Sequence, residues 1–190
     1  MIIGIEGGIG SGKTLSMVNL GLEDLYKGKK IFTNVKLKKV KKYRDRITYL
    51  TKEKVTDIFH LVKSGEFNME NSTILIDEAH NYIDSRNSAS SKNKIFSYWI
   101  LQSRHTGKGS CDIIYTTQEL RQIDVRLRNN TDWIIQPNII GTQRRGKIKV
   151  PVLIRLDITA KIKHKWRKMI SYIDVGISRE MYDTHELIDF

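Results

Sequence analysis

The sequence predicts an α/β protein built around a parallel sheet, and three stretches support this fold class. Residues 2–5 form a short apolar run that leads into a glycine-rich loop and then an apolar-periodic segment, the order expected for strand, loop and helix. Residues 73–78 form a β-branched apolar run that ends in two acids, and residues 111–118 form a further run that ends in polar side chains. Such runs are typical of buried parallel strands whose carboxyl ends face a ligand.

The composition indicates one folded domain without a membrane span. The chain has 190 residues, of which 39% are hydrophobic, enough for a proper core. Without internal repeats or a low-complexity linker, we expect one domain over 1–190, with a core over 1–136 and a β-rich extension over 137–190. No apolar run approaches the length of a transmembrane helix, so we expect no direct insertion into a membrane. With no visible secretory signal and Cys111 as the single cysteine, the expected location is cytoplasmic.

The balance of charge is strongly basic. Lys and Arg number 33 against 21 Asp and Glu, which gives a formal net charge of +12. This excess fits either an ordinary basic surface or a polyanionic partner such as nucleic acid. The basic run 36–46 has the same two interpretations, a solvated segment or a contact with a phosphate backbone.

The glycine-rich loop fits the phosphate-binding pattern G-x-x-x-x-G-K-[ST]. Its glycines permit backbone conformations in which successive N–H groups surround one anion, and the following helix N-terminus adds further donors. We expect Lys13 to reach the β- and γ-phosphates of ATP and the Thr14 hydroxyl to bind Mg²⁺. The expected nucleotide-binding residues are Gly7, Gly8, Ile9, Gly10, Ser11, Gly12, Lys13 and Thr14.

The two acids at the end of the run 73–78 supply the remaining chemistry of nucleotide hydrolysis. We expect Asp77 to hold Mg²⁺ through water and Glu78 to polarise the attacking water. The alternative is that both acids cap the next helix. A small-molecule kinase needs the phosphate loop but no Glu beside the metal-binding Asp, so Glu78 favours an ATPase.

Further polar side chains flank the third strand. Gln118 is a candidate for sensing the γ-phosphate or orienting water, with capping of the next helix as the alternative. Phosphoryl transfer also benefits from an arginine at the γ-phosphate, supplied in cis or by a neighbouring subunit. We rank Arg104 first because it precedes this strand, then Arg126 and Arg128, and expect at least two of the three to be ordinary surface charge.

The remaining core elements follow from periodicity and turn residues. Gly28 is the expected stop of the first helix, and Gln136-Pro137-Asn138 is expected to close the last strand. A serine-rich segment, 84–94, is expected to be a loop. The helices are expected at 15–25, 51–63 and 95–104. The further strands are expected at 31–35, 47–50 and 131–135.

The last part of the chain has a different character. Residues 148–158 alternate apolar and polar side chains, and residues 169–177 also have an extended pattern. The two segments predict a β-hairpin around a basic turn, 161–168. Trp166 in this turn is either available for stacking on nucleic acid or folded back onto the sheet.

Together these motifs resemble the HerA/FtsK superfamily of P-loop ATPases. The similarity covers residues 1–136 well, and beyond them only a short motif at 182–186 supports it. Within the superfamily the chain looks most like the DNA-packaging ATPases of viruses with internal membranes, and next like the Zot-like assembly ATPases of filamentous phages. The residues that carry the resemblance lie at 7–14, 74–80, 103–105, 112–118 and 123–128.

The resemblance implies a three-layer P-loop NTPase fold, to which the β-hairpin predicted from the tail is added as a C-terminal extension. The sheet is expected to be RecA-like, with helices on both faces and an additional strand, which bears Gln118, between the strands of the phosphate loop and Asp77. The active form is expected to be a ring, often a hexamer, that moves DNA, taken here as double-stranded. The implied task is packaging of a viral genome into a preformed capsid, in the host cytoplasm or associated with the virion.

The resemblance also implies partners and leaves alternatives open. Capsid or membrane-associated proteins are expected partners. Zot-like proteins usually carry a membrane-spanning segment, and the lack of one counts against that group. The alternatives are a Zot-like motor for virion assembly or for secretion of a DNA–protein complex, and a small P-loop kinase.

Overall fold

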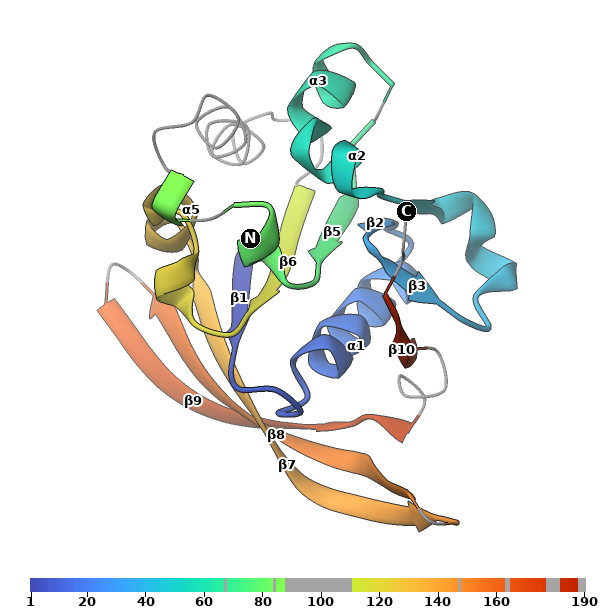
Figure 1. Cartoon of the computed structure of the whole chain (residues 1–190), viewed down its shortest axis with the longest axis vertical. Helices are drawn as coiled ribbons and strands as arrows, with labels where there is room; N and C mark the ends of the chain where they lie inside the picture. Colours follow the sequence, from blue (N-terminus) through green and yellow to red (C-terminus); the bar gives the residue numbers. More distant parts are fainter. Residues whose placement is uncertain are drawn as a thin grey trace.

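The described strands form one large sheet and one small one (Figure 1). The structure, a computed structural model, describes residues 1–66, 68–83, 85–87, 111–146, 148–162, 165–176 and 182–187. Its strands are β1 (Ile2–Glu6), β2 (Lys30–Thr33), β3 (Val35–Leu37), β4 (Ile47–Tyr49), β5 (Ser72–Ile76), β6 (Cys111–Thr117), β7 (Trp133–Arg145), β8 (Ile148–Ile162), β9 (Lys165–Asp174) and β10 (Tyr182–Leu187). The large sheet has the order β4-β2-β5-β6-β1-β7-β8-β9, and β10 pairs with β3.

The large sheet is parallel from β4 through β7, which confirms the predicted fold class. β6 lies between β5 and β1, so the strand that precedes Gln118 separates the other two nucleotide-binding strands as predicted. Glu6 at the end of β1 lies opposite Thr117 at the end of β6. Ile76 at the end of β5 lies opposite Tyr115. The carboxyl ends of the three strands therefore meet at one edge of the sheet, where ligands bind in this class of fold.

Helices cover both faces of the sheet, which gives the expected three layers (Figure 1). The α-helices are α1 (Lys13–Tyr26), α2 (Lys52–Thr56), α3 (Ile58–Lys63) and α5 (Val125–Asn129). The short 3₁₀ helices are η1 (Lys41–Arg46), η2 (Ala79–Asn81), η3 (Ser85–Asn87) and η4 (Leu120–Gln122). α1 ends before Gly28, whose φ of 95° confirms the predicted glycine stop. The expected loop at 84–94 and helix at 95–104 lie outside the described residues except for η3.

The prediction of one helix over 51–63 is wrong, because the segment is divided into α2 and α3 at Asp57. The Thr51 side chain caps α2 by accepting the Lys54 N–H, and the Asp57 N–H closes α2 on Glu53 O. A β-branched residue followed by Asp is a weak continuation for a helix. The break leaves both Val55 and Ile58 fully buried.

Each face of the sheet contributes to a separate hydrophobic core, because successive residues of a strand point to opposite faces. In β1, Ile2 belongs to the core beneath the short helices, whereas Ile3 and Ile5 belong to the core beneath α1. The same alternation holds in β5, where Ile74 and Leu75 pack on opposite sides. Burial on both faces explains why these strands are continuous apolar runs in the sequence.

The end predicted for the last core strand is wrong, because β7 continues through Pro137 to Arg145. β1 pairs with β7 only as far as Ile135, so the following part of β7 has β8 on one side and no β1 partner on the other. A proline without an N–H is tolerated at such an edge. Pro137 therefore lies opposite Leu156 of β8 within the strand rather than closing it.

The predicted C-terminal β-hairpin is confirmed, with longer strands than expected. β8 and β9 are antiparallel and remain paired from Leu153 opposite Asp174 to Ile162 opposite Lys165. Most of the expected basic turn therefore belongs to the strands.

The expected strand at 31–35 is divided, because β2 ends at Thr33 and β3 starts at Val35. The residue between them, Asn34, faces the candidate site described next.

Candidate nucleotide-binding site

The glycine-rich loop joins β1 to the start of α1, as the sequence predicted. Gly12 is the N-cap of α1 with φ 95°, a conformation that strains residues with a Cβ. A Cβ on Gly12 would also lie 2.8 Å from Ile154 Cδ1. Glycine is required here because the loop packs directly against β8.

Lys13 is buried, with its ammonium group directed at the loop that precedes it. Its Nζ donates to Gly8 O at 3.1 Å, and the side chain is only 6% exposed. Within the described atoms, the buried hydroxyl of Ser11 has no hydrogen-bond partner. A buried cation and an unpartnered donor at a helix N-terminus fit an anion such as a nucleotide phosphate.

Thr14 and Asp77 meet although 63 residues separate them. Thr14 Oγ1 donates to Asp77 at 3.0 Å from Oδ1 and 3.1 Å from Oδ2. A hydroxyl and a carboxylate at the mouth of the loop are the oxygen donors that Mg²⁺ prefers, with water and phosphate oxygens completing its shell. The described residues contain no cluster of three or more His, Cys, Asp or Glu side chains suited to a metal held by protein alone.

Asp77 lies in a nearly closed environment. Burial raises the pKa of its carboxyl, and the repulsion of Glu78 adds to the rise, whereas hydrogen bonds from Thr116 and Thr14 and the attraction of Lys13 oppose it. Thr116 Oγ1 donates to Asp77 Oδ1 at 2.6 Å. A bound divalent cation would favour the ionised carboxylate that burial disfavours.

Glu78 has a left-handed backbone, with φ 51° and ψ 49°. Its N–H donates to Thr116 Oγ1 at 2.9 Å, and its Oε2 lies 3.4 Å from His80 Nε2. Although Glu78 precedes η2, its side chain makes no capping hydrogen bond, so the capping alternative is not observed. Non-glycine residues in this conformation concentrate at functional sites, where the surrounding contacts hold them.

Asn34 is a site residue that the sequence reasoning missed. Its Oδ1 accepts the Asp77 N–H at 2.8 Å, and its Nδ2 donates to Asp77 O at 3.0 Å. The same Nδ2 lies 3.2 Å from Tyr82 Oη. Asn34 thereby fixes the backbone from which Asp77 and Glu78 project. The sequence could have indicated Asn34, because it is a polar residue at the end of a buried apolar run. Thr116, two residues before Gln118, is another polar residue in such a position.

The remaining predicted site residues lie at different places. Gln118 follows β6 and is exposed; the next helix, η4, has Glu119 as its N-cap, so Gln118 does not cap it. Arg126 in α5 lies 3.5 Å from Asp124, which caps that helix through its side chain. Arg128 is half-buried in the same helix. Arg104 lies outside the described residues. An active role for Gln118 or for any of the three arginines stays a prediction.

The structure brings together the loop 7–14, Lys13, Thr14, Asp77 and Glu78 at one edge of a three-layer sheet. That arrangement defines the fold of a P-loop NTPase. The chain belongs to the zonular occludens toxin (Zot) family, whose family model matches residues 1–171. A comparison with curated proteins found no match.

Solved structures share this fold. The N-terminal domain of zonular occludens toxin from Neisseria meningitidis is 23% identical over 96% of this chain and 98% of that chain, with a TM-score of 0.65. The genome packaging NTPase B204 from Sulfolobus turreted icosahedral virus 2, in complex with sulfate, is 14% identical over 90% of this chain and 94% of that chain, with a TM-score of 0.56. B204 in complex with ATP-gammaS is 14% identical over 88% of this chain and 95% of that chain, with a TM-score of 0.54.

The family model identifies the Zot-like group, ranked second from the sequence, as the family, and the solved structures show that the P-loop ATPase fold is shared. Zot-like proteins were ranked second because they usually carry a membrane-spanning segment, and the sequence predicts none here. The described helices include none that is long and apolar enough to cross a membrane, and this property did not decide the family.

Proposed function

We propose that this protein is a Mg²⁺-dependent ATPase that uses hydrolysis to move DNA. The contact of Thr14 with Asp77, beside Lys13 in the phosphate loop, is the single observation that carries the proposal. Lys13 and the loop N–H groups hold the phosphates. Thr14 and Asp77 would hold Mg²⁺, which would supply positive charge against the transferred phosphoryl group. Glu78 accepts a proton from the attacking water.

Membership of the Zot family favours a motor for virion assembly or for secretion of a DNA–protein complex. Packaging of a genome into a capsid is the second candidate, favoured by the likeness to B204, which is described as a genome packaging NTPase. A small kinase is the third and fits least, because Glu78 stands beside Asp77 at the strand end.

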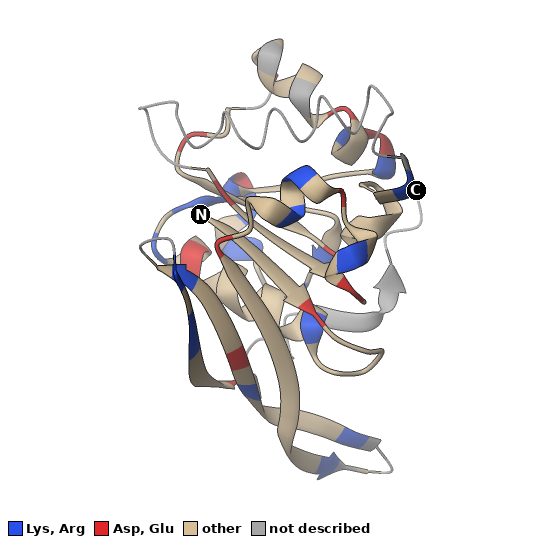
Figure 2. Cartoon of the chain, turned by 90° about the vertical axis from the view of Figure 1, so that its left-hand side faces the viewer, with Lys and Arg blue, Asp and Glu red and all other residues tan. Residues whose placement is uncertain are grey.

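The DNA partner is supported by the charge of the chain. The net charge is +12, and Figure 2 has Lys and Arg residues along the long antiparallel strands as well as on the helices. In β9, Trp166 is 50% exposed and Tyr172 is 59% exposed, so two aromatic rings lie open to solvent among basic residues. Aromatic rings between cations are suited to stacking on nucleobases.

The test of hydrolysis is ATP turnover with Mg²⁺ by wild type and by Glu78→Gln. We expect the substitution to lower turnover by about 10²-fold or more while nucleotide binding persists. Glu66→Gln, at an exposed site away from the loop, is the matched control and should behave as wild type. Wild-type turnover that Glu78→Gln leaves intact would remove Glu78 from the mechanism, and no wild-type hydrolysis would end the ATPase proposal.

The test of DNA movement compares turnover with and without double-stranded DNA over a range of salt concentrations. Stimulation that weakens as salt rises supports a DNA motor, because binding releases counterions from the phosphates. Salt-insensitive turnover without DNA binding supports a motor with a protein cargo. Transfer of phosphate to a nucleotide acceptor, with little ATP loss in its absence, supports the kinase.

The test of a ring is complementation between inactive subunits. Arg104→Ala, Arg126→Ala and Arg128→Ala are each mixed with Lys13→Ala, which lacks the phosphate-loop cation. Recovery of turnover in one mixture identifies the arginine that acts in trans on a neighbour. Full activity of all three single variants would exclude them as arginine fingers.

A further inference from the structure

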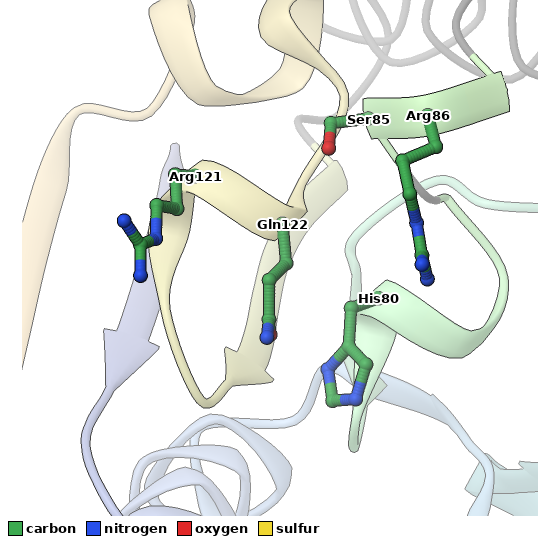
Figure 3. A pocket seen from close by; sticks show the side chains of 5 residues that line it. All are labelled: His80, Ser85, Arg86, Arg121 and Gln122. Atoms are coloured by element: carbon green, nitrogen blue, oxygen red, sulfur yellow. The ribbon is translucent and has the colours of Figure 1, made fainter.

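A hollow lies outside the phosphate loop, next to His80 (Figure 3). Its volume is about 340 Å³, and three short 3₁₀ helices form it. It is lined by His80 of η2, Ser85 and Arg86 of η3, and Arg121 and Gln122 of η4. The mechanism of hydrolysis proposed above gives none of these residues a task.

The lining is rich in hydrogen-bond donors. It includes two guanidinium groups, an imidazole, an amide and a hydroxyl, and none of the five described lining residues is acidic. In Figure 3, the polar ends of His80, Arg86 and Gln122 converge, whereas Arg121 turns away from them. Arg121 forms an ion pair with Glu119. Planar guanidinium groups bind oxyanions through paired N–H donors, so the described part of the lining suits a phosphate oxyanion.

His80 connects this hollow to the candidate general base. Its Nε2 lies 3.4 Å from Glu78 Oε2, and its Nδ1 lies 3.4 Å from Thr117 Oγ1. Thr117 Oγ1 also lies 3.5 Å from Oε1 of Gln122, another lining residue. Two lining residues therefore contact Thr117, and one of them reaches Glu78 directly.

The contact with His80 affects what Glu78 can do. A carboxylate oxygen engaged by an imidazole is less available to accept a proton from water. An oxyanion in the hollow competes with that carboxylate for the imidazole N–H. Binding in the hollow and proton acceptance by Glu78 are then coupled through one side chain.

We propose that this hollow is a phosphate-binding site whose occupant draws His80 away from Glu78 and so raises ATP hydrolysis. The inference rests on the proposed ATPase function. The phosphate is either a phosphodiester group of bound DNA or free inorganic phosphate, since the two present the same oxygens to the guanidinium and imidazole groups. His80 acts here as a positioning residue, because it touches Glu78 and not the reacting atoms.

Binding is measured first, without ATP, by the NMR signals of the His80 imidazole during titration with inorganic phosphate and with a short DNA duplex. We expect the signals of His80 to shift in the wild type and to remain fixed in Arg86→Ala. Lys27→Ala, which removes one exposed positive charge from the end of α1, is the control and should shift as wild type does. No shift with either titrant would overturn the site, whether or not the protein hydrolyses ATP.

Coupling is measured second, by the ratio of turnover with titrant to turnover without it. We expect DNA to raise wild-type turnover by about fivefold or more, and Arg86→Ala to bring the ratio close to one. His80→Ala should have high turnover without DNA and no further increase, whereas His80→Gln, which keeps a donor for Glu78, should remain responsive.

Each remaining outcome decides the proposal. Phosphate that shifts His80 and raises turnover, where DNA does neither, assigns the site to the free ion. A lower turnover of His80→Ala than of wild type, with DNA stimulation intact, contradicts release of Glu78 by His80. A His80 shift without wild-type hydrolysis keeps the phosphate site and rejects the ATPase function.

Discussion

Thr116 Oγ1 lies 2.6 Å from Asp77 Oδ1, and the same hydroxyl accepts the backbone N–H of Glu78 at 2.9 Å. One buried hydroxyl thus contacts both acids of the site, from the strand that lies beside them. Its hydrogen bond to Asp77 offsets part of the free-energy cost of burying that carboxyl. It also accepts the backbone N–H of Glu78, which has no helical partner because the backbone is left-handed there.

Thr116→Val is therefore expected to damage the site while keeping the shape of the side chain. The partly buried Glu78 N–H loses its acceptor, so the free energy of unfolding should fall by about 1–3 kcal/mol. ATP turnover should fall as well, because the carboxylate of Asp77 loses a donor. Urea denaturation and steady-state turnover measure the two effects. Thr116→Ser keeps the hydroxyl and should restore both; equal values for Thr116→Val and wild type would contradict the assignment.

Asn34→Ala removes the side chain that pairs with both backbone groups of Asp77. We expect a loss of about 2 kcal/mol in unfolding free energy, since a buried N–H and a C=O lose their partners. Turnover should fall more than ATP affinity, because Asn34 bonds to the backbone that carries the acids and lies outside the loop 7–14. Binding of a fluorescent ATP analogue and steady-state kinetics separate the two quantities. A change in affinity alone would show that Asn34 contributes to nucleotide binding instead.

Gly12→Ala is expected to disrupt the loop, whereas Gly8→Ala is expected to be tolerated by the fold. At Gly12 a Cβ meets φ 95° and lies 2.8 Å from Ile154 Cδ1, while at Gly8 a Cβ has no heavy-atom neighbour within 4 Å. The left-handed conformation alone costs about 1–2 kcal/mol for alanine. The melting temperatures of the two variants test this contrast. Equal melting temperatures would contradict the packing of the loop against β8.

The Lys29–Asp112 ion pair predicts a loss of stability in acid. Burial opposes ionisation of Asp112, but hydrogen bonds from Lys29 and the Met1 amino group outweigh it and lower the pKa of Asp112 below 3.8. A carboxyl whose pKa is lower in the folded than in the unfolded protein stabilises the fold at pH values above 3.8. This stabilisation is lost as the pH falls through the pKa of the folded state.

Asp112→Asn should remove that contribution, lowering the unfolding free energy by about 2 kcal/mol at pH 7 and by less in acid. Urea denaturation at several pH values below neutral measures the difference. Asp45→Asn, at an exposed position, serves as the control and should leave stability close to that of wild type. A difference that stayed constant down to the lowest pH would argue against ionisation of Asp112 as its source.

Trp166→Ala is expected to weaken binding of single-stranded DNA about tenfold, since stacking of one base on an aromatic ring is worth about 1–3 kcal/mol. Trp166→Phe keeps a ring and should retain most of the affinity. Fluorescence anisotropy with a labelled oligonucleotide at fixed salt gives both values. An unchanged affinity in Trp166→Ala would place the DNA contact elsewhere on the molecule.

Much of the nucleotide site was predictable because its chemistry depends on residues that are local in sequence. The loop 7–14 requires glycines at fixed spacing before Lys13 and Thr14, and Asp77 and Glu78 must end a buried strand. The alternating pattern of 148–158 likewise predicts a strand, because a period of two residues is a property of the chain itself.

Contacts between distant segments were decided only by the tertiary structure. The role of Asn34 depends on β2 lying beside β5, and the tolerance of β7 for Pro137 depends on β1 ending earlier in the sheet. The hollow beside His80 needs three short helices that meet only after β5 and β6 have paired. The sequence determined which side chains bring phosphate chemistry, whereas the order of the strands determined which neighbours position them, because sheet pairing joins residues that no local pattern relates.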